Sequence, residues 1–167
     1  MRNIELKARL TNLAVARNIA HKLATKRLGM QTQVDTYFHA NAGRLKLRQI
    51  EGGAAELVWY ARPDDPNPKA SDYQLVPIEQ SEALKRALAA ALGIVNVVRK
   101  RREIFLWHNV RIHLDEVDGL GHFLEFEAVL ADDMTDAAGE AQLQELMCQF
   151  GIRPEDQVAG SYTDMIG

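Results

Sequence analysis

Asn3-Ile4-Glu5-Leu6-Lys7, near the start of the chain, and Phe123-Leu124-Glu125-Phe126-Glu127, near its end, decide the fold that we expect. Polar and apolar residues alternate in the first stretch, and glutamates alternate with apolar residues in the second. A period of two is typical of a β-strand with two different faces. Glu125 and Glu127 therefore share a face, as do Glu5 and Lys7. Two carboxylates side by side are ligands that a hard divalent cation prefers.

The 167-residue chain has the composition of an ordinary globular protein, with 47% hydrophobic and 26% charged residues. We expect a single domain over 1–167. The net charge of −3 gives no overall basic field, so nucleic acid is not an expected partner. No apolar run is long enough to span a membrane and no signal peptide opens the chain, which predicts a cytoplasmic location and no membrane contact. Cys148 is the only cysteine, which excludes an intrachain disulfide, and we expect it to pack among apolar helix residues.

Periodicity along the chain predicts eight strands and three helices. The expected strands cover 2–10, a stretch from 33, 44–48, 56–62, 69–73, both sides of the His108-Asn109 turn, and the segment around Glu125. The first helix is capped by Thr11 or Asn12 and stopped by Gly29. The second is capped by Ser81, has Leu84, Leu88 and Leu92 inward and is ended by Gly93, and the third covers 136–150.

Three connections between these strands are too short for a parallel crossover, so the sheet is expected to be mostly antiparallel. About eight antiparallel strands in one domain favour a closed barrel, whose interior is filled by alternate residues of every strand. The predicted fold class is α+β, mainly β: an eight-stranded antiparallel closed β-barrel with about three flanking helices.

The polar face of these strands is segregated by the sign of its charges. The cations are Lys46, Arg48, Arg62, Lys69, Lys100, Arg102 and Arg111, and the acids are Glu5, Asp115, Glu125 and Glu127. An antiparallel sheet commonly has one solvated face, and periodicity alone favours that interpretation. A solvated face usually mixes the two signs, however, and a closed barrel brings the acidic first and last strands together. If the face points inward, so many buried cations need an anionic partner, which favours a polyphosphate.

Several polar residues allow two interpretations at this point. His39, His108, His113 and His122 show no metal-ligand spacing, and only His113, between Arg111 and Asp115 on the polar face, merits a test. Asp35 and Tyr37 have the parity of the charged face but are equally suited to a barrel rim. Tyr162 either closes one end of the barrel or belongs to a plain tail.

The chain resembles the CYTH superfamily, also called triphosphate tunnel metalloenzymes. The resemblance rests on Glu5-x-Lys7, Leu45-Lys46-Leu47-Arg48, Lys69-x-Ser71-x-Tyr73, Lys100-x-Arg102, Asp115 followed by Gly119 to Glu127, and the Ser161-Tyr162-x-Asp164 tail. It covers essentially the whole chain, and it is greatest toward class IV adenylyl cyclases and thiamine triphosphatases. The resemblance implies an eight-stranded tunnel, a triphosphate-bearing substrate and one or two divalent metals. Asn3 replaces the first glutamate of the family's Glu-x-Glu-x-Lys motif, and it offers a carbonyl oxygen but no charge.

We expect the site residues to fall into three groups. The catalytic residues are Glu5, Lys7, Arg102 and Arg111; the phosphate-binding residues are Lys7, Lys46, Arg48, Arg62, Lys69, Lys100 and Arg102; and the ligands of Mg²⁺ or Mn²⁺ are Glu5, Asp115, Glu125 and Glu127. The expected ligand is a small triphosphate, namely ATP, thiamine triphosphate or tripolyphosphate. The sequence is compatible with a homodimer.

Three functions fit this arrangement. The leading hypothesis is a metal-dependent triphosphatase, in which water attacks the terminal phosphorus and the cations stabilise the spreading charge. The second is an adenylyl cyclase, which needs a base-binding pocket that the sequence does not reveal. The third, motivated by Asn3, is a module that binds a triphosphate or polyphosphate without turnover.

Overall fold

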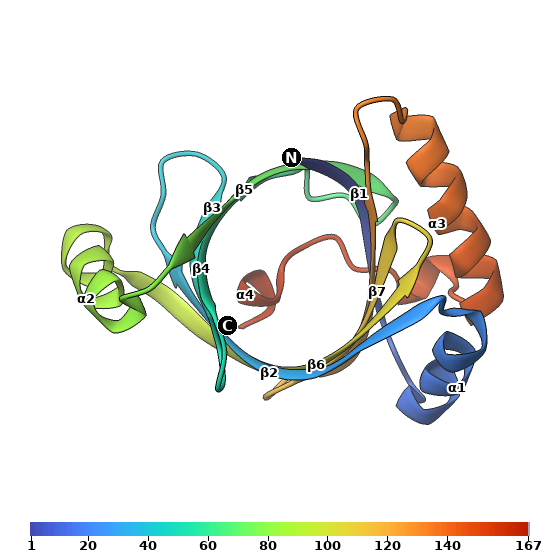
Figure 1. Cartoon of the computed structure of the whole chain (residues 1–167), viewed down its shortest axis with the longest axis horizontal. Coiled ribbons are helices and arrows are strands. Elements are labelled where there is room, and N and C mark those ends of the chain that lie inside the picture. The colour runs from blue at the N-terminus through green and yellow to red at the C-terminus, as the bar shows by residue number, and fades with distance from the viewer. Residues whose placement is uncertain (167) are drawn as a thin grey trace.

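Pairing between the first and the last strand closes the sheet (Figure 1). The computed structural model describes residues 1–166. Its strands are β1 (Arg2–Arg9), β2 (Lys26–Phe38), β3 (Arg44–Ile50), β4 (Ala55–Ala61), β5 (Lys69–Ile78), β6 (Ile94–Trp107), β7 (Val110–Val117) and β8 (Gly121–Val129). They form a closed antiparallel barrel in the order β1-β5-β4-β3-β2-β6-β7-β8. The predicted fold class is confirmed, including the contact between the two ends of the sheet.

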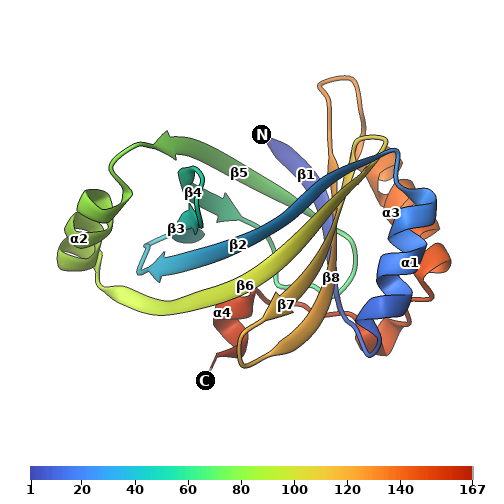
Figure 2. The ribbon, with the colours of Figure 1, turned by 60° about the horizontal axis from the view of Figure 1, so that its bottom comes forward.

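The main hydrophobic core lies outside the barrel wall. The helices α1 (Leu13–Leu23) and α3 (Asp136–Phe150) pack beside β1, β7 and β8 on the outer face, as Figures 1 and 2 show. Outward-facing residues such as Leu6, Ile112 and Phe126 are fully buried under these helices. Because alternate residues of a strand point to opposite faces, this apolar outer layer leaves the inner face of the same strands for polar side chains.

Local signals explain where α1 and α3 begin and end. The Asn12 side chain accepts a hydrogen bond from the Val15 amide, and Thr135 caps α3 in the same way. Contrary to expectation, α1 ends at Leu23 and Gly29 lies inside β2. Gly29 has φ +96° and follows a break in the register between β2 and β6, so its role is to permit a bulge rather than to end a helix.

Two other expectations about helices are correct only in part or wrong. The helix α2 (Ser81–Leu92) stands at the far end of β5 and β6 (Figure 2), and its N-cap residue is Gln80 and not the expected Ser81. Leu84 and Leu88 are half-buried on its inward side as expected, whereas Leu92 is exposed. The main contacts of α2 are with β2 and β3. Cys148 is exposed on α3, because Leu143, Leu146 and Met147 occupy the face that packs on the barrel.

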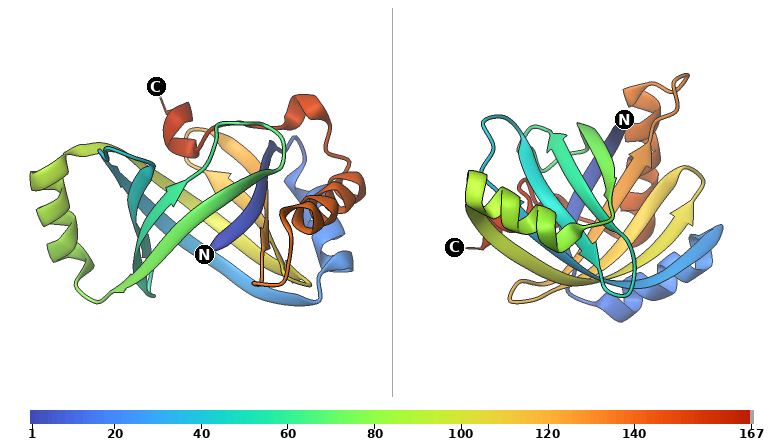
Figure 3. Two further views of the ribbon diagram at one scale, coloured as in Figure 1. Left: turned by 90° about the horizontal axis from the view of Figure 1, so that it is seen from above. Right: turned by 60° about the vertical axis from the view of Figure 1, so that its left-hand side comes forward.

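The C-terminal segment crosses one end of the barrel. It contains a 3₁₀ turn (Pro154–Asp156) and a short helix that the sequence did not predict, α4 (Tyr162–Met165). The left view of Figure 3 shows α4 across one end and the N-terminus toward the opposite end. Tyr162 is buried and packs edge-on against Phe123 of β8, 5.0 Å between ring centroids. Of the two interpretations of Tyr162, the structure therefore favours closure of the barrel end.

Candidate active site

The barrel encloses a cavity of about 390 Å³ with an ionic lining. Seven cations line it, namely Lys7, Lys46, Arg48, Arg62, Lys100, Arg102 and Arg111, together with four acids, Glu5, Glu56, Glu125 and Glu127. The charged face of the strands thus points inward, and it is not simply a solvated surface. The cross-strand register decides which charges are neighbours. Glu127 of β8 lies opposite Glu5 of β1 and Arg111 of β7, and Glu125 lies opposite Lys7 of β1 and His113 of β7.

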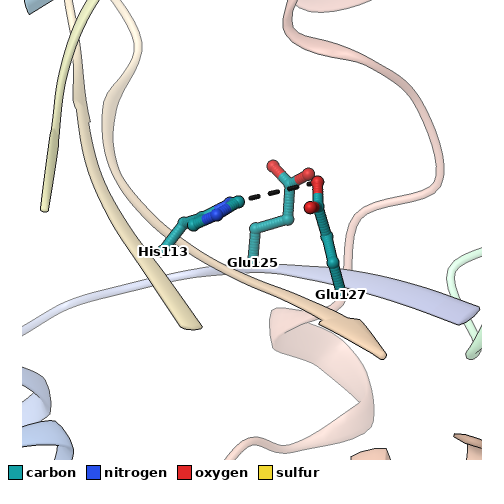
Figure 4. Close-up of side chains that lie close together, drawn as sticks. All are labelled: His113, Glu125 and Glu127. Atoms are coloured by element: carbon teal, nitrogen blue, oxygen red, sulfur yellow. Dashed lines mark ion pairs between the residues drawn. The ribbon is translucent and has the colours of Figure 1, made fainter. Parts of the chain in front are cut away.

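Glu125 and Glu127 form the acidic part of this cavity, with His113 beside them (Figure 4). One oxygen or nitrogen from each of the three side chains lies within 4.8 Å of the others. Glu125 Oε2 lies 3.5 Å from Lys7 Nζ and accepts a hydrogen bond of 3.1 Å from Arg102. Glu127 Oε2 lies 3.7 Å from Arg111 Nη1. Each carboxylate therefore has one oxygen turned toward a cation.

The two carboxylates differ in acidity because they have different neighbours. Burial and the nearby charge of Glu125 raise the pKa of Glu127 to about 7. Burial acts on Glu125 in the same direction, but Lys7 and Arg102 outweigh it and hold the pKa of Glu125 well below its usual range. Burial and the charge of Arg102 hold the pKa of His113 well below its usual range, which favours a neutral imidazole.

Asp35 organises the cationic wall opposite these acids. Its carboxylate is fully buried and accepts hydrogen bonds from Lys46 (2.9 Å), Lys100 (3.0 Å) and Arg48 (3.0 Å from Nε). These partners come from β3 and β6, the two strands that flank β2. Burial raises the pKa of Asp35, but the three cations outweigh this effect and hold it well below its usual range. Asp35 does not itself line the cavity, but it is fully buried against three cations that do, so it is not a rim residue, a distinction that its parity alone could not make.

A second buried pair fixes Arg102. Asp115 accepts two hydrogen bonds from Arg102, of 2.7 and 2.6 Å, and a third of 2.6 Å from the Tyr162 hydroxyl. Asp115 is fully buried and does not line the cavity, so the structure does not bring this expected metal ligand together with Glu125 and Glu127. Its role in the fold is to hold Arg102 in place.

Two further predicted site residues, Glu5 and Lys69, and the motif residue Asn3 differ in whether they line the cavity. Glu5 lines the cavity, with Oε1 2.8 Å from Arg62 Nε, in an ion pair without the alignment of a hydrogen bond. Lys69 is buried but does not line the cavity, and its ammonium donates to the Asp65 carbonyl. Asn3 does line the cavity and is buried, and its Oδ1 has no hydrogen-bond partner among residues 1–166.

Four apolar residues gather at one end of the cavity, beside Gln31 and Glu56. Leu28, Ile50, Leu75 and Ile104 line it from β2, β3, β5 and β6. By the antiparallel register these positions lie toward the end where β1 begins, opposite the end that α4 covers. This patch was not predicted from the sequence, because single apolar residues on a mostly polar face do not change the alternation of the strands.

A closed antiparallel barrel with cations and carboxylates on its inner wall is the class of protein that this fold and cavity define. The CYTH domain family matches residues 1–162, nearly the entire sequence. The chain therefore belongs to the CYTH family, as the sequence motifs indicated.

Relatives share the whole length of this chain. A protein of Methanocaldococcus jannaschii, provisionally named an adenylate cyclase, is 26% identical over 100% of this chain and 99% of its own. A Pyrococcus horikoshii protein of known structure has a TM-score of 0.88 at 23% identity, with 99% of each chain covered. A Hippeastrum protein, described as an adenylyl cyclase candidate with a dominant triphosphatase activity, has a TM-score of 0.65 at 15% identity over 95% of this chain and 91% of its own. At these identities the solved structures show a shared fold.

Proposed function

We propose that this protein is a divalent-metal-dependent enzyme that hydrolyses a triphosphate inside the barrel. The observation that carries the proposal is the juxtaposition, in one cavity, of a cationic wall and a pair of carboxylates. A triphosphate bears about four negative charges and a dense set of acceptor oxygens, so it complements that wall. The family's adenylate cyclase and triphosphatase names agree with a triphosphate ligand.

The acidic residues fit the metal that the family implies. Glu125 and Glu127 supply carboxylate oxygens side by side, with Glu5 opposite Glu127 in the strand register. Oxygen ligands of this type suit Mg²⁺ and Mn²⁺. When bound, such an ion polarises a phosphoryl oxygen and lowers the pKa of a coordinated water.

The cations of the wall would bind and position the substrate. Lys46, Arg48 and Lys100 are held by Asp35, and Arg102 by Asp115, so these donors are already oriented when a phosphate chain enters. Fixed donors stabilise developing negative charge without the cost of reorganising solvent. Lys7 and Arg111, which face Glu125 and Glu127, would link the phosphate site to the acidic site. We propose that Lys7, Arg102 and Arg111 contribute to catalysis in this way, together with Glu5.

The apolar end of the cavity bears on the choice of substrate. Leu28, Ile50, Leu75 and Ile104 offer nothing to a phosphate but would contact an organic group attached to it. This favours ATP or thiamine triphosphate over tripolyphosphate. It also keeps the adenylyl cyclase as a second candidate, since a cyclase needs a place for the base.

Product analysis separates these functions. The purified protein is incubated with ATP, thiamine triphosphate or tripolyphosphate, each with Mg²⁺ and with Mn²⁺. Release of orthophosphate would support the triphosphatase hypothesis. Formation of cyclic AMP and pyrophosphate would instead support the adenylyl cyclase hypothesis. Binding without any product would support the non-catalytic module that Asn3 suggests. Glu127→Gln is the matched control, because it keeps the shape of the side chain and removes one ligand charge.

A further inference from the structure

His113 is a buried imidazole whose Nδ1 has no hydrogen-bond partner in the part of the chain that the structure describes. It projects from β7 opposite Glu125 in the register, and its side chain is 5% exposed. Among residues 1–166, no group forms a hydrogen bond with its Nδ1. An unsatisfied buried nitrogen costs about 1–3 kcal/mol, so a native structure usually provides a partner for it. Figure 4 shows the ring directed at Glu125 and Glu127.

The carboxylates of the two glutamates lie against each other beside this ring (Figure 4). Their Oε2 atoms face Lys7, Arg102 and Arg111, as described above. Glu127 Oε1 lies 4.0 Å from His113 Nδ1, which is too long for a hydrogen bond. The three side chains therefore bring one possible donor atom each to within 4.8 Å of the others.

The separations suit an ion between the three donors. Bonds of about 2.0–2.2 Å to nitrogen and oxygen allow two donors on one ion to lie up to about 4.3 Å apart. The 4.0 Å between His113 Nδ1 and Glu127 Oε1 falls within that limit. The upper bound of 4.8 Å for the whole group requires at most a small side-chain adjustment.

We propose that His113 is a metal ligand together with Glu125 and Glu127, and that this nitrogen makes the site prefer a first-row transition ion to Mg²⁺. The proposal rests on the proposed metal-dependent function and specifies the metal of that same site. Imidazole nitrogen binds transition ions well, whereas Mg²⁺ prefers six oxygen ligands and gives up water reluctantly. Asn3, which brings no charge to this cavity, leaves the carboxylate set weaker and increases the share of His113 in ion binding.

Metal titration of the substrate-free protein tests this assignment. Isothermal titration calorimetry with Co²⁺, Mn²⁺ and Mg²⁺ is compared for the wild type, His113→Gln and His39→Gln, an exposed histidine outside the cavity. We expect His113→Gln to weaken Co²⁺ and Mn²⁺ binding about tenfold or more and Mg²⁺ binding less than about threefold, as loss of one nitrogen ligand predicts. The His39 variant should match the wild type. Equal Co²⁺ affinity in the wild type and His113→Gln would overturn the proposal.

A measurement on the wild type keeps the test independent of how the variant folds. Pulsed electron paramagnetic resonance of the Mn²⁺-loaded protein should detect coupling to a directly bound ¹⁴N nucleus, and absence of that coupling would also contradict the assignment. Neither readout uses turnover. A protein that cleaves triphosphates but shows no nitrogen ligand therefore refutes this inference alone, whereas one that binds Mn²⁺ through nitrogen but cleaves nothing refutes the proposed function alone.

Discussion

At the scale of single residues, Glu125 and Glu127 are neighbours in one cavity whose pKa values shift in opposite directions. Ionised Glu127 destabilises the fold, because its pKa of about 7 lies above its usual 4.5. This penalty is absent below about pH 4.5 and complete above about pH 7. We expect Glu127→Gln to raise the free energy of unfolding at pH 8.5 by about 1–3 kcal/mol. Glu125→Gln should lower it, because the pKa of Glu125 is depressed by Lys7 and Arg102.

Urea denaturation in the presence of a chelator measures both effects. The gain from Glu127→Gln should shrink as the pH falls toward 5, and both variants should lose metal-dependent turnover. Stability changes of the same sign in the two variants at pH 8.5 would show that the two carboxylates are equivalent, contrary to this account.

Asp35 provides the second prediction at this scale. Asp35→Asn leaves three cations facing one another without their shared carboxylate, and breaking a buried pair in this way costs about 3–5 kcal/mol of unfolding free energy. Tripolyphosphate should restore part of the loss, so its shift of the melting temperature should be larger for the variant than for the wild type. Asp72→Asn, which removes an exposed ion pair with Arg2, is the control and should cost no more than about 1 kcal/mol. An equal tripolyphosphate shift in both proteins would argue against a polyanion site at this wall.

Asp35 and Asp115 also show how far the site could be predicted from the sequence. Alternation placed Asp35 and Asp115 on the polar face, which is correct for both. It could not show that Asp35 unites three cations or that Asp115 lies behind Arg102, because these roles depend on the register of β2 with β3 and β6 and of β6 with β7. His113 was predicted to share a face with Arg111, but its position opposite Glu125 required the pairing of β7 with β8.

At the scale of the strand, the inner and outer faces should differ in function. Arg111 of β7 lines the cavity with a 42% exposed side chain, 3.7 Å from a glutamate. Arg101 of β6 does not line the cavity, and its 60% exposed side chain lies 3.5 Å from Glu116. The two arginines are thus matched in exposure and pairing. We expect Arg111→Ala to lower kcat/KM about 10- to 100-fold, equivalent to about 1.4–2.8 kcal/mol of transition-state stabilisation, and Arg101→Ala to change it less than about twofold.

Steady-state kinetics with the substrate identified by product analysis gives this comparison. Equal losses in the two variants would mean that the arginines act through stability or net charge and not through the cavity.

The difference between inner and outer faces also explains why strands were predicted better than helices. A period of two fixes the face of every residue in a paired strand, whereas the small contact of α2 with β2 and β3 leaves its apolar positions at most half-buried.

At the scale of the whole molecule, the barrel keeps a group of cations in its interior at a cost in stability. Burial and the charge of Arg102 lower the pKa of Lys100 to about 7, and burial and the charge of Arg48 lower that of Lys46 to about 8. The unfolded chain, with ordinary lysine pKa values near 10.5, binds more protons than the folded chain between about pH 7 and pH 10. These two lysines therefore make stability rise with pH across this window.

The ligand-free protein should accordingly unfold less readily at pH 9 than at pH 7, and Lys100 should account for about 1–2 kcal/mol of the difference. Urea denaturation of the wild type and Lys100→Met at the two pH values isolates this contribution, since the variant lacks the titrating ammonium and should show a smaller rise. A bound triphosphate favours the charged lysines, so its stabilising effect should be greater at pH 7 than at pH 9. Equal rises in the wild type and the variant would show that the interior lysines keep their ordinary acidity, and the barrel would then hold its cations without this penalty. A smaller rise in the variant, together with stronger stabilisation by triphosphate at pH 7, would show that one set of buried lysines both limits the stability of the empty barrel and contributes to anion binding.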